Sequence, residues 1–496
     1  MWRAYWLLLT LLTAALLTAA PPVRLLTTRD ASLLAAADAA RLGKEAETAL
    51  YLWLPNIPAA DVGTIQVVLS GHCNSLSTET DLSPLAIVPG SDGQLLRADL
   101  SNYGWQRKTL DLFFDSDPYF YSTAEEIVLW PGGYWPRYQQ HYEAGRYSVG
   151  KAVRTTAPWL DPAAMKTLVE TCQAKAPIVN ALYFFQSTAA CSDGRKPNYY
   201  DMLGIKDEKT FQVLVGVDLK RDVRFARELL ETVSISGVSE EPRAIAGTEK
   251  IGGRYWRTFD IKRGTQSDKK DPHRIYGTDS DGNPRLEFDA SEQYAHLPNG
   301  LWATLLVDNK GKLQDSVPDT IAGNKLATGK NFRIENPVSC IGCHKNGGLQ
   351  DIDGWVRASF TPPPFILQAA TPKDAVRLRQ QYLRKLEPFL IADRCKYADA
   401  LLQITGLTPQ KYAAAYAGLF NYIVDAQVGL EWVERDLGVP RAKFLAALEW
   451  KLRTTNTLDP VLNTFLLPPE RFKPITITAW WRTYPIAQQI LQEFPK

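Results

Sequence analysis

Five consecutive residues have the types and spacing that cofactor chemistry needs: Cys340-Ile341-Gly342-Cys343-His344. This C-x-x-C-H pattern is the attachment sequence of a c-type haem. Two thiols separated by two residues, on the first turn of a helix, reach the two vinyl groups of one porphyrin and form thioethers, and the adjacent imidazole is a good ligand for haem iron. We therefore expect one covalently attached haem c, with Cys340 and Cys343 as attachment residues and His344 as the proximal iron ligand.

Two other interpretations of the cysteine pair are weaker. A redox-active dithiol needs a thioredoxin-like strand before the cysteines, whereas the preceding Asn336-Pro337-Val338-Ser339 is typical of a loop. A zinc site needs two further ligands nearby. After His344, Cys395 is the only cysteine and no histidine occurs.

The ligand on the other side of the iron is left open by the sequence. No methionine follows Met202, so the downstream methionine ligand of small electron-transfer cytochromes is missing. The distal candidates are His273 and His296, and the remaining possibilities are His72, His141, Met165 and Met202. Otherwise the sixth position is open or binds water. For each histidine taken singly, a surface or hydrogen-bonded role is the ordinary alternative.

The first twenty residues have the layout of a secretory signal peptide. A positive start at Met1-Trp2-Arg3 precedes an apolar run over residues 4–17, and Thr18-Ala19-Ala20 supplies small residues for cleavage. A membrane anchor is the alternative, but the run is shorter than the ~20 residues that a spanning helix needs. We expect a periplasmic or otherwise exported protein, with no transmembrane span after cleavage.

Composition narrows the class of protein. The 496 residues are 45% hydrophobic and 22% charged, as in a folded globular protein. The 56 Lys and Arg nearly balance the 54 Asp and Glu, and the net charge of +2 is too small for a nucleic-acid footprint. We therefore expect no nucleic-acid partner.

The hydrophobic patterning predicts an α+β fold. An N-terminal mixed α/β region with long loops precedes a β-hairpin and a mainly helical haem c domain. The predicted domains are a signal peptide (1–20), an α+β domain of unknown role (27–285) and the haem c domain with C-terminal helices (286–496). We expect a helix over 32–54 capped by Ser32, strands at 67–69, 95–100, 178–185 and 255–259, a hairpin over 301–313, and helices starting at Thr371, Thr408 and Arg441.

Four cysteines lie outside the motif: Cys73, Cys172, Cys191 and Cys395. Four cysteines allow three disulfide pairings. A Cys172–Cys191 bond is favoured because these two are close in sequence. Buried free thiols are the alternative, although they suit an oxidising compartment less well.

A cluster of basic residues falls on the first predicted C-terminal helix. It consists of Arg377, Arg379, Arg384 and Lys385. A solvated helix face is the ordinary explanation. The functional hypothesis is a docking patch for an acidic, exported redox partner, because transient encounters of this kind use charge to speed association.

Several stretches resemble one group of exported bacterial proteins of unknown role that carry a single c-type haem motif. They occur in the same order as in that group, over roughly residues 65 to 360: 74–77, 96–105, 236–239, 253–256, 297–301, 306–311 and 339–344. The resemblance implies haem binding and electron transfer and brings no substrate. Similar proteins have a histidine in the loop of His273, which places it ahead of His296 as distal ligand.

The motif favours an exported cytochrome that transfers electrons. The alternatives are a peroxidase-like haem enzyme and a haem-based sensor, both with an open sixth iron position. A peroxidase needs a distal base, which the five histidines do not identify. A haem alone requires only ~100 residues of chain, so the rest of the protein must serve a further purpose.

Overall fold

The computed structural model describes residues 25–116, 121–123, 152–154, 161–191, 194–219, 228–233, 243–261, 288–316, 334–349, 386–468, 471 and 474–495. The predicted signal peptide, the helix start at Thr371 and the basic cluster therefore lie outside the described residues. The fold of the described part is α+β, and its C-terminal part is mainly helical, which confirms the predicted fold class. No helix in that part is both long and apolar enough to cross a membrane.

A four-stranded sheet organises the N-terminal part. Strand β1 (Ala49–Trp53) lies between β3 (Leu95–Asp99), which is antiparallel to it, and β6 (Ile178–Asn180), which is parallel. The short β2 (Ala86–Ile87) pairs with the outer side of β3. All five residues of β1 are buried, as in a strand covered on both faces.

Helices and short elements make up the rest of the N-terminal part. The longer helices are α2 (Thr28–Leu42), α3 (Ala59–Ser75), α7 (Pro162–Cys172), α8 (Ala181–Ala189) and α10 (Glu208–Leu214). The short helices are α4 (Arg107–Leu110), α5 (Phe113–Ser116) and α9 (Tyr199–Leu203), with 3₁₀ turns η1 (Gly43–Thr48) and η2 (Leu100–Tyr103). Strands β4 (Tyr121–Thr123) and β5 (Ala152–Arg154) form a separate pair.

A five-stranded antiparallel sheet follows. Its strands are β7 (Glu228–Val233), β8 (Arg243–Lys250), β9 (Gly253–Ile261), β10 (Phe288–His296) and β11 (Trp302–Asp308), and they pair in the order β11-β10-β9-β8-β7. Beyond β11, Asp308 and Lys312 close a turn at Gly311, which has a φ of 75°, and Val307 bridges to Leu313. The predicted hairpin is thus confirmed.

The two faces of this sheet have different neighbours. Side chains alternate along a strand, so Glu292, Tyr294 and His296 share one face of β10, which we call the α12 face. Gln293 lies on the other face and hydrogen-bonds Glu208 of α10. The α12 face takes its name from the helix α12 (Val338–Cys343), whose end lies against Glu292.

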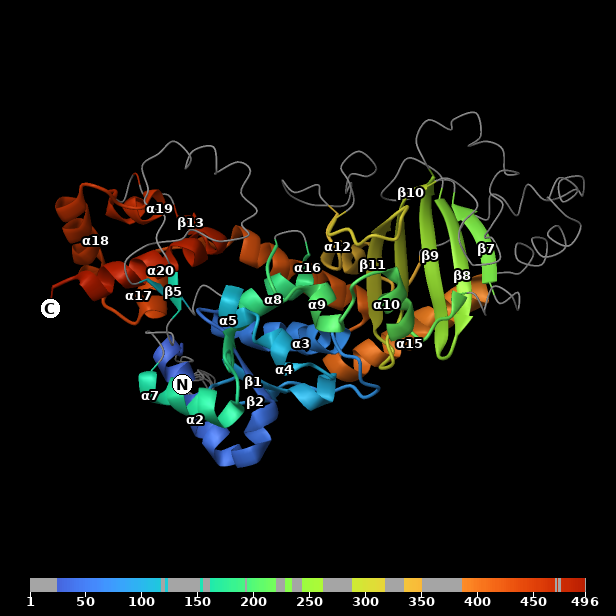
Figure 1. The fold of residues 1–496 in the computed structure, drawn as a ribbon, viewed down its shortest axis with the longest axis horizontal. Coiled ribbons are helices and arrows are strands. Elements are labelled where there is room, and N and C mark those ends of the chain that lie inside the picture. Colours follow the sequence, from blue (N-terminus) through green and yellow to red (C-terminus); the bar gives the residue numbers. More distant parts are fainter. Residues whose placement is uncertain are drawn as a thin grey trace, which may run out of the picture.

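The C-terminal part consists mainly of helices. They are α15 (Glu387–Thr405), α16 (Pro409–Asp425), α17 (Leu430–Leu437), α18 (Arg441–Thr455), α19 (Pro460–Asn463) and α20 (Ile477–Glu493), with η6 (Thr464–Leu466) and a small ladder of β12 (Gln427–Val428) and β13 (Ile475–Thr476). Thr408 caps α16, as predicted. Figure 1 shows α17–α20 at one end of an elongated molecule and the five-stranded sheet at the other.

One buried core joins the two predicted domains. A single cluster of buried residues extends from Ala31 of α2 to Ile490 of α20. Moreover, β10 pairs with β9 across the boundary predicted at residues 285 and 286. That boundary is therefore wrong for the described part of the chain, because strands on both sides of it share a sheet.

Three predicted elements need correction. The first helix begins at Thr28 with Thr27 as its cap and ends at Leu42, and residues 49–53 of the predicted helix form β1 instead. Residues 67–69 lie in α3, because the surrounding residues continue a buried helix despite two consecutive valines. Strand β6 stops at Asn180, whose side chain accepts hydrogen bonds from the first turn of α8.

A close contact between α3 and α16 yields a stability test. A Cβ at Gly71 would lie 2.5 Å from the ring of the buried Tyr412. We expect Gly71→Ala to destabilise the protein by about 1–3 kcal/mol, because overpacking shifts side chains from their preferred positions. Equilibrium denaturation followed by circular dichroism measures the change.

The matched control is Gly63→Ala, because Gly63 lies on the same helix and its Cβ would meet no atom within 4 Å. That variant should gain up to about 1 kcal/mol from the better helix propensity of alanine. Equal effects of the two substitutions would contradict the close packing of α3 on α16.

Candidate haem-attachment site

The C-x-x-C-H motif lies on the short helix α12 and the residue that ends it. The Ile341 amide donates to Pro337 O at 3.0 Å, and the His344 amide donates to Cys340 O at 2.8 Å. Residues three and four positions apart share a face of a helix. Cys343 and His344 therefore follow Cys340 on one side of this turn, as attachment to a single porphyrin requires.

Hydrogen bonds to β11 hold the buried end of α12. The Cys340 thiol donates to Asn336 Oδ1 at 3.2 Å. Asn336 in turn accepts from the Thr304 hydroxyl and donates from Nδ2 to the Tyr200 hydroxyl at 3.2 Å. The first cysteine is thereby fixed against the five-stranded sheet, and Cys343 is only partly buried.

The His344 ring is oriented by a backbone carbonyl. Its Nδ1 lies 3.1 Å from Gly348 O, and a carbonyl at this distance requires a proton on Nδ1. A hydrogen bond of this kind fixes the tautomer and the ring orientation of metal-binding histidines. Nε2 is therefore the nitrogen available to iron.

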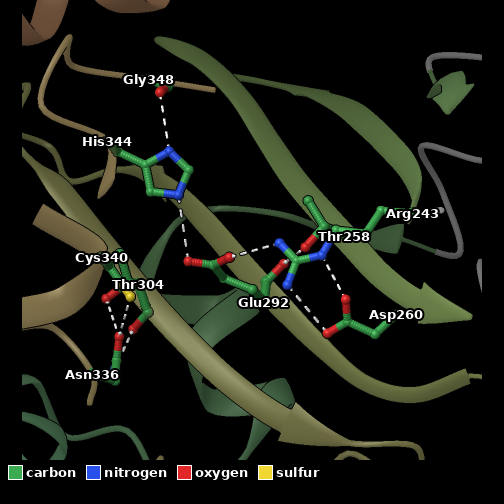
Figure 2. A network of polar contacts seen from close by, with 9 residues as sticks. All are labelled: Arg243, Thr258, Asp260, Glu292, Thr304, Asn336, Cys340, His344 and Gly348. Carbon is green, nitrogen blue, oxygen red and sulfur yellow. Dashed lines mark hydrogen bonds and ion pairs between the residues drawn. The ribbon is translucent and has the colours of Figure 1, made fainter. Parts of the chain in front are cut away.

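A buried carboxylate faces Nε2. Glu292 Oε1 lies 3.4 Å from His344 Nε2, and its other oxygen lies 3.5 Å from Arg243 Nη1. Arg243 also donates from Nη2 to Asp260 Oδ2 at 3.3 Å. Figure 2 shows these groups in a row, with the Glu292 carboxylate between the imidazole and the guanidinium. We call Asp260, Arg243 and Glu292 the charge row.

The charge row shifts the acid–base properties of the site. Burial raises the pKa of Glu292, but the hydrogen bond and charge of His344, the charge of Arg243 and the Cys340 thiol together bring the pKa down to about 2. Burial raises the pKa of Cys343 to about 11 and that of Cys340 well above its usual value, and the Glu292 charge adds to both effects. At neutral pH the two sulfurs are therefore thiols and Glu292 is ionised.

Aromatic rings form the apolar wall beside His344. Its ring lies 5.1 Å from that of Tyr294 and 6.1 Å from that of Trp302, measured between centroids, and Tyr294 stacks on Trp302. The adjoining pocket is lined by Cys340, His344 and Trp302. Further lining comes from Tyr199, Tyr397 and Tyr412.

This pocket tests whether a porphyrin fits. It encloses a void of about 30 Å³, which is room for about one water molecule, whereas ligand pockets hold roughly 300 Å³ or more. Two thiols and a carbonyl-oriented imidazole on one helical turn are the donors that haem c needs. The donor set is therefore that of haem c, but the described lining leaves no room for a porphyrin, and the side chains around His344 must move apart if one enters here.

The two predicted distal histidines have different outcomes. His273 lies outside the described residues. His296 lies on the α12 face, where its Nδ1 is 2.7 Å from Gly300 O and its Nε2 is 3.5 Å from Asp393 Oδ1. Both His296 and His344 contact the ring of Trp302, but the side chain facing His344 Nε2 is Glu292. The role of either histidine as iron ligand stays a prediction.

The remaining candidates lie elsewhere or are not described. His72 is buried in α3, with Nε2 2.7 Å from the Thr188 hydroxyl and Nδ1 3.1 Å from the Tyr416 hydroxyl. Burial lowers the pKa of His72 to about 3, so this imidazole is a neutral, hydrogen-bonded core residue. Met165 and Met202 are buried in α7 and α9, and His141 lies outside the described residues.

The sequence alone did not indicate the charge row. Glu292 is a lone carboxylate within a strand, and its partner Arg243 is 49 positions away. Nothing in the local sequence links the two. The signal that existed was the alternation of β10, which places Glu292 on the same face as Tyr294 and His296. Within the described residues, no group of three or more His, Cys, Asp or Glu is arranged to hold a metal ion.

None of the six cysteines is in a disulfide, so the favoured Cys172–Cys191 bond is wrong. Cys172 ends α7, near Arg107 and Asp38, whereas Cys191 follows α8 and accepts a backbone hydrogen bond from Tyr200. The two cysteines are close in sequence but not in space, because β6 and α8 intervene and lead the chain to a different part of the core.

Alkylation tests this correction. In the protein denatured without reductant, we expect all four cysteines outside the motif to react, because none of them is in a disulfide. In the folded protein at pH 8 we expect only the exposed Cys395 to react quickly, because the thiolate is the reactive form and burial raises the pKa of Cys172 to about 11. Mass spectrometry counts the adducts. Only two adducts among these four cysteines after denaturation would show that a disulfide is present.

Comparisons with known proteins supply no relative for this chain. No protein-family model, no curated protein and no solved structure matches it. Its function must therefore be inferred from the motif and its surroundings.

Proposed function

We propose that this chain is an exported monohaem c-type cytochrome that binds one haem covalently and transfers electrons to or from an exported redox partner. The observation that carries the proposal is the C-x-x-C-H motif on α12, with His344 Nδ1 oriented by Gly348 O and Nε2 directed away from that bond. The orienting carbonyl leaves Nε2 as the nitrogen that an iron ligand needs.

Each residue of the site has a defined part in this function. Haem, when bound, supplies a one-electron couple. Cys340 and Cys343 hold its edge, and their raised pKa values keep them as the neutral thiols that add to vinyl groups. His344 binds iron from one side. Tyr294 and Trp302 exclude water next to the imidazole, which is one way in which a protein controls haem potential.

A haem enzyme or sensor with an open sixth position is the second candidate. The observation that favours it is Glu292, because the side chain that lies 3.4 Å from Nε2 is a carboxylate and neither a histidine nor a methionine. An open position would admit carbon monoxide or peroxide to the iron.

Removal of the thiols tests covalent attachment. We produce the exported protein in a host competent in cytochrome maturation and extract it with acidic acetone. The wild type should keep its pigment, and the double variant Cys340→Ala with Cys343→Ala should keep none, because no thioether remains. Cys395→Ala is the matched control and should behave as the wild type, since Cys395 is exposed on α15. A colourless wild type would refute the proposed function.

Optical spectra of the ferrous protein separate the two candidates. A low-spin spectrum that does not change when carbon monoxide is added indicates a strong sixth ligand and favours electron transfer. Rapid binding of carbon monoxide indicates an open sixth position. If the sixth ligand is a histidine, either His273→Ala or His296→Ala should convert low-spin iron to high-spin. Unchanged spectra in both variants would exclude both histidines as ligands.

A further inference from the structure

A buried histidine and a buried tyrosine meet where the helices α3, α8 and α16 contact one another. His72 of α3 and Tyr416 of α16 are both 0% exposed. The Tyr416 hydroxyl lies 3.1 Å from His72 Nδ1, and His72 Nε2 lies 2.7 Å from the hydroxyl of Thr188 on α8. Both nitrogens of the imidazole are therefore hydrogen-bonded inside the core, away from the motif on α12.

The direction of each hydrogen bond follows from Thr188. Its hydroxyl donates to Phe184 O at 2.7 Å, and a hydroxyl carries only one proton. Thr188 must therefore accept a hydrogen bond from His72, which places the imidazole proton on Nε2. His72 Nδ1 is then the acceptor, and the Tyr416 hydroxyl donates its proton to it.

Burial keeps both groups neutral in the resting protein. Burial lowers the pKa of His72 to about 3, so its Nδ1 lone pair is available as a base at neutral pH. Burial raises the pKa of Tyr416 well above its usual value, so its phenol stays protonated. Removal of one electron turns a phenol into a very strong acid, stronger than an imidazolium that burial destabilises. An oxidised Tyr416 would therefore give its proton to His72.

We propose that Tyr416 and His72 form a redox-active pair, in which Tyr416 loses one electron from its ring and its phenolic proton to His72 Nδ1. The products are a neutral tyrosyl radical and an imidazolium, and the electron reduces a one-electron oxidant stronger than a ferric cytochrome, such as a peroxide-activated metal centre. When a donor returns the electron, the proton returns from Nδ1 to the phenol. This inference goes beyond the proposed function and does not rest on it.

The hydrogen bonds favour a reversible step. The Nε2 proton is held by Thr188, and the Thr188 proton is held by the Phe184 carbonyl, which is already bonded within α8. The transferred proton thus has no further acceptor along this chain of bonds. It stays next to the phenoxyl oxygen, where it is available when the tyrosine is reduced again.

Aromatic rings connect Tyr416 with the partly exposed Trp302. The ring of Tyr412 lies 5.7 Å from that of Tyr416, and the ring of Tyr397 lies 5.9 Å from that of Trp302, measured between centroids. Trp302, Tyr397 and Tyr412 line the same small void. Phenol and indole rings are the aromatic side chains that lose an electron most easily. The electron can therefore leave Tyr416 through these three rings, and the oxidant need not reach the core.

Photo-oxidation of the full chain tests the proposal. A ruthenium polypyridyl complex, excited by light in the presence of a sacrificial electron acceptor, supplies the oxidant, and electron paramagnetic resonance detects the radical. The wild type should form a long-lived neutral tyrosyl radical. Tyr416→Phe keeps the ring but should lose this signal, and His72→Gln should reduce it, because an amide is too weak a base to take the proton. Tyr412→Phe should slow the formation of the radical.

Tyr103→Phe is the matched control. Tyr103 is 1% exposed, and its hydroxyl donates to the carbonyl of Ser83 at 2.8 Å, which is not a base, so this variant should keep the signal. Absence of a long-lived radical in the wild type, or its persistence in Tyr416→Phe, would overturn the proposal.

A deuterium isotope effect keeps the test decisive if His72→Gln does not fold. After equilibration in D₂O, the radical of the wild type should form more slowly than in H₂O, because the proton moves with the electron. Equal rates would overturn the transfer to His72. A colourless wild type would refute the cytochrome function and leave this test of the tyrosine–histidine pair unaffected.

Discussion

The imidazole of His344 is held from both sides, and the organisation of the site depends on this. The Gly348 carbonyl fixes one nitrogen and the Glu292 carboxylate faces the other. The first contact is local, within four residues of the motif. The second joins α12 to the middle of a sheet whose strands begin more than one hundred residues earlier in the chain. The orientation of one ring therefore links a short helix to the whole sheet.

This link explains part of the size of the protein. A helix of six residues has no stable core of its own, and α12 is supported by Asn336 and Thr304 at its start and by β10 at its end. The sheet in turn rests on α10 and α15 and shares its core with both terminal regions. Much of the chain outside the motif thus serves to present one face of β8, β9 and β10 to α12.

The sequence predicted those parts that local chemistry determines. The motif, the hairpin after β11 and the capped start of α16 depend on neighbouring residues, and the described structure has the last two as expected. The strand predicted at residues 67–69 was wrong because a buried helix tolerates valine when tertiary packing covers it. The Cys172–Cys191 pairing failed because distance along the chain does not measure distance in space. The Arg243–Glu292 contact could not be predicted from the sequence, because it depends on the pairing of β8, β9 and β10.

Strand β10 lies between β9 and β11 and so is paired along both edges. Slippage by one residue would turn Gln293 toward α12 and bury Glu292 against α10. Both neighbouring ladders would have to break for this to happen, which makes such an error costly. The chemistry of the motif is thus protected by the position of its carboxylate in the interior of a sheet, where a misaligned strand has no free edge on which to shift.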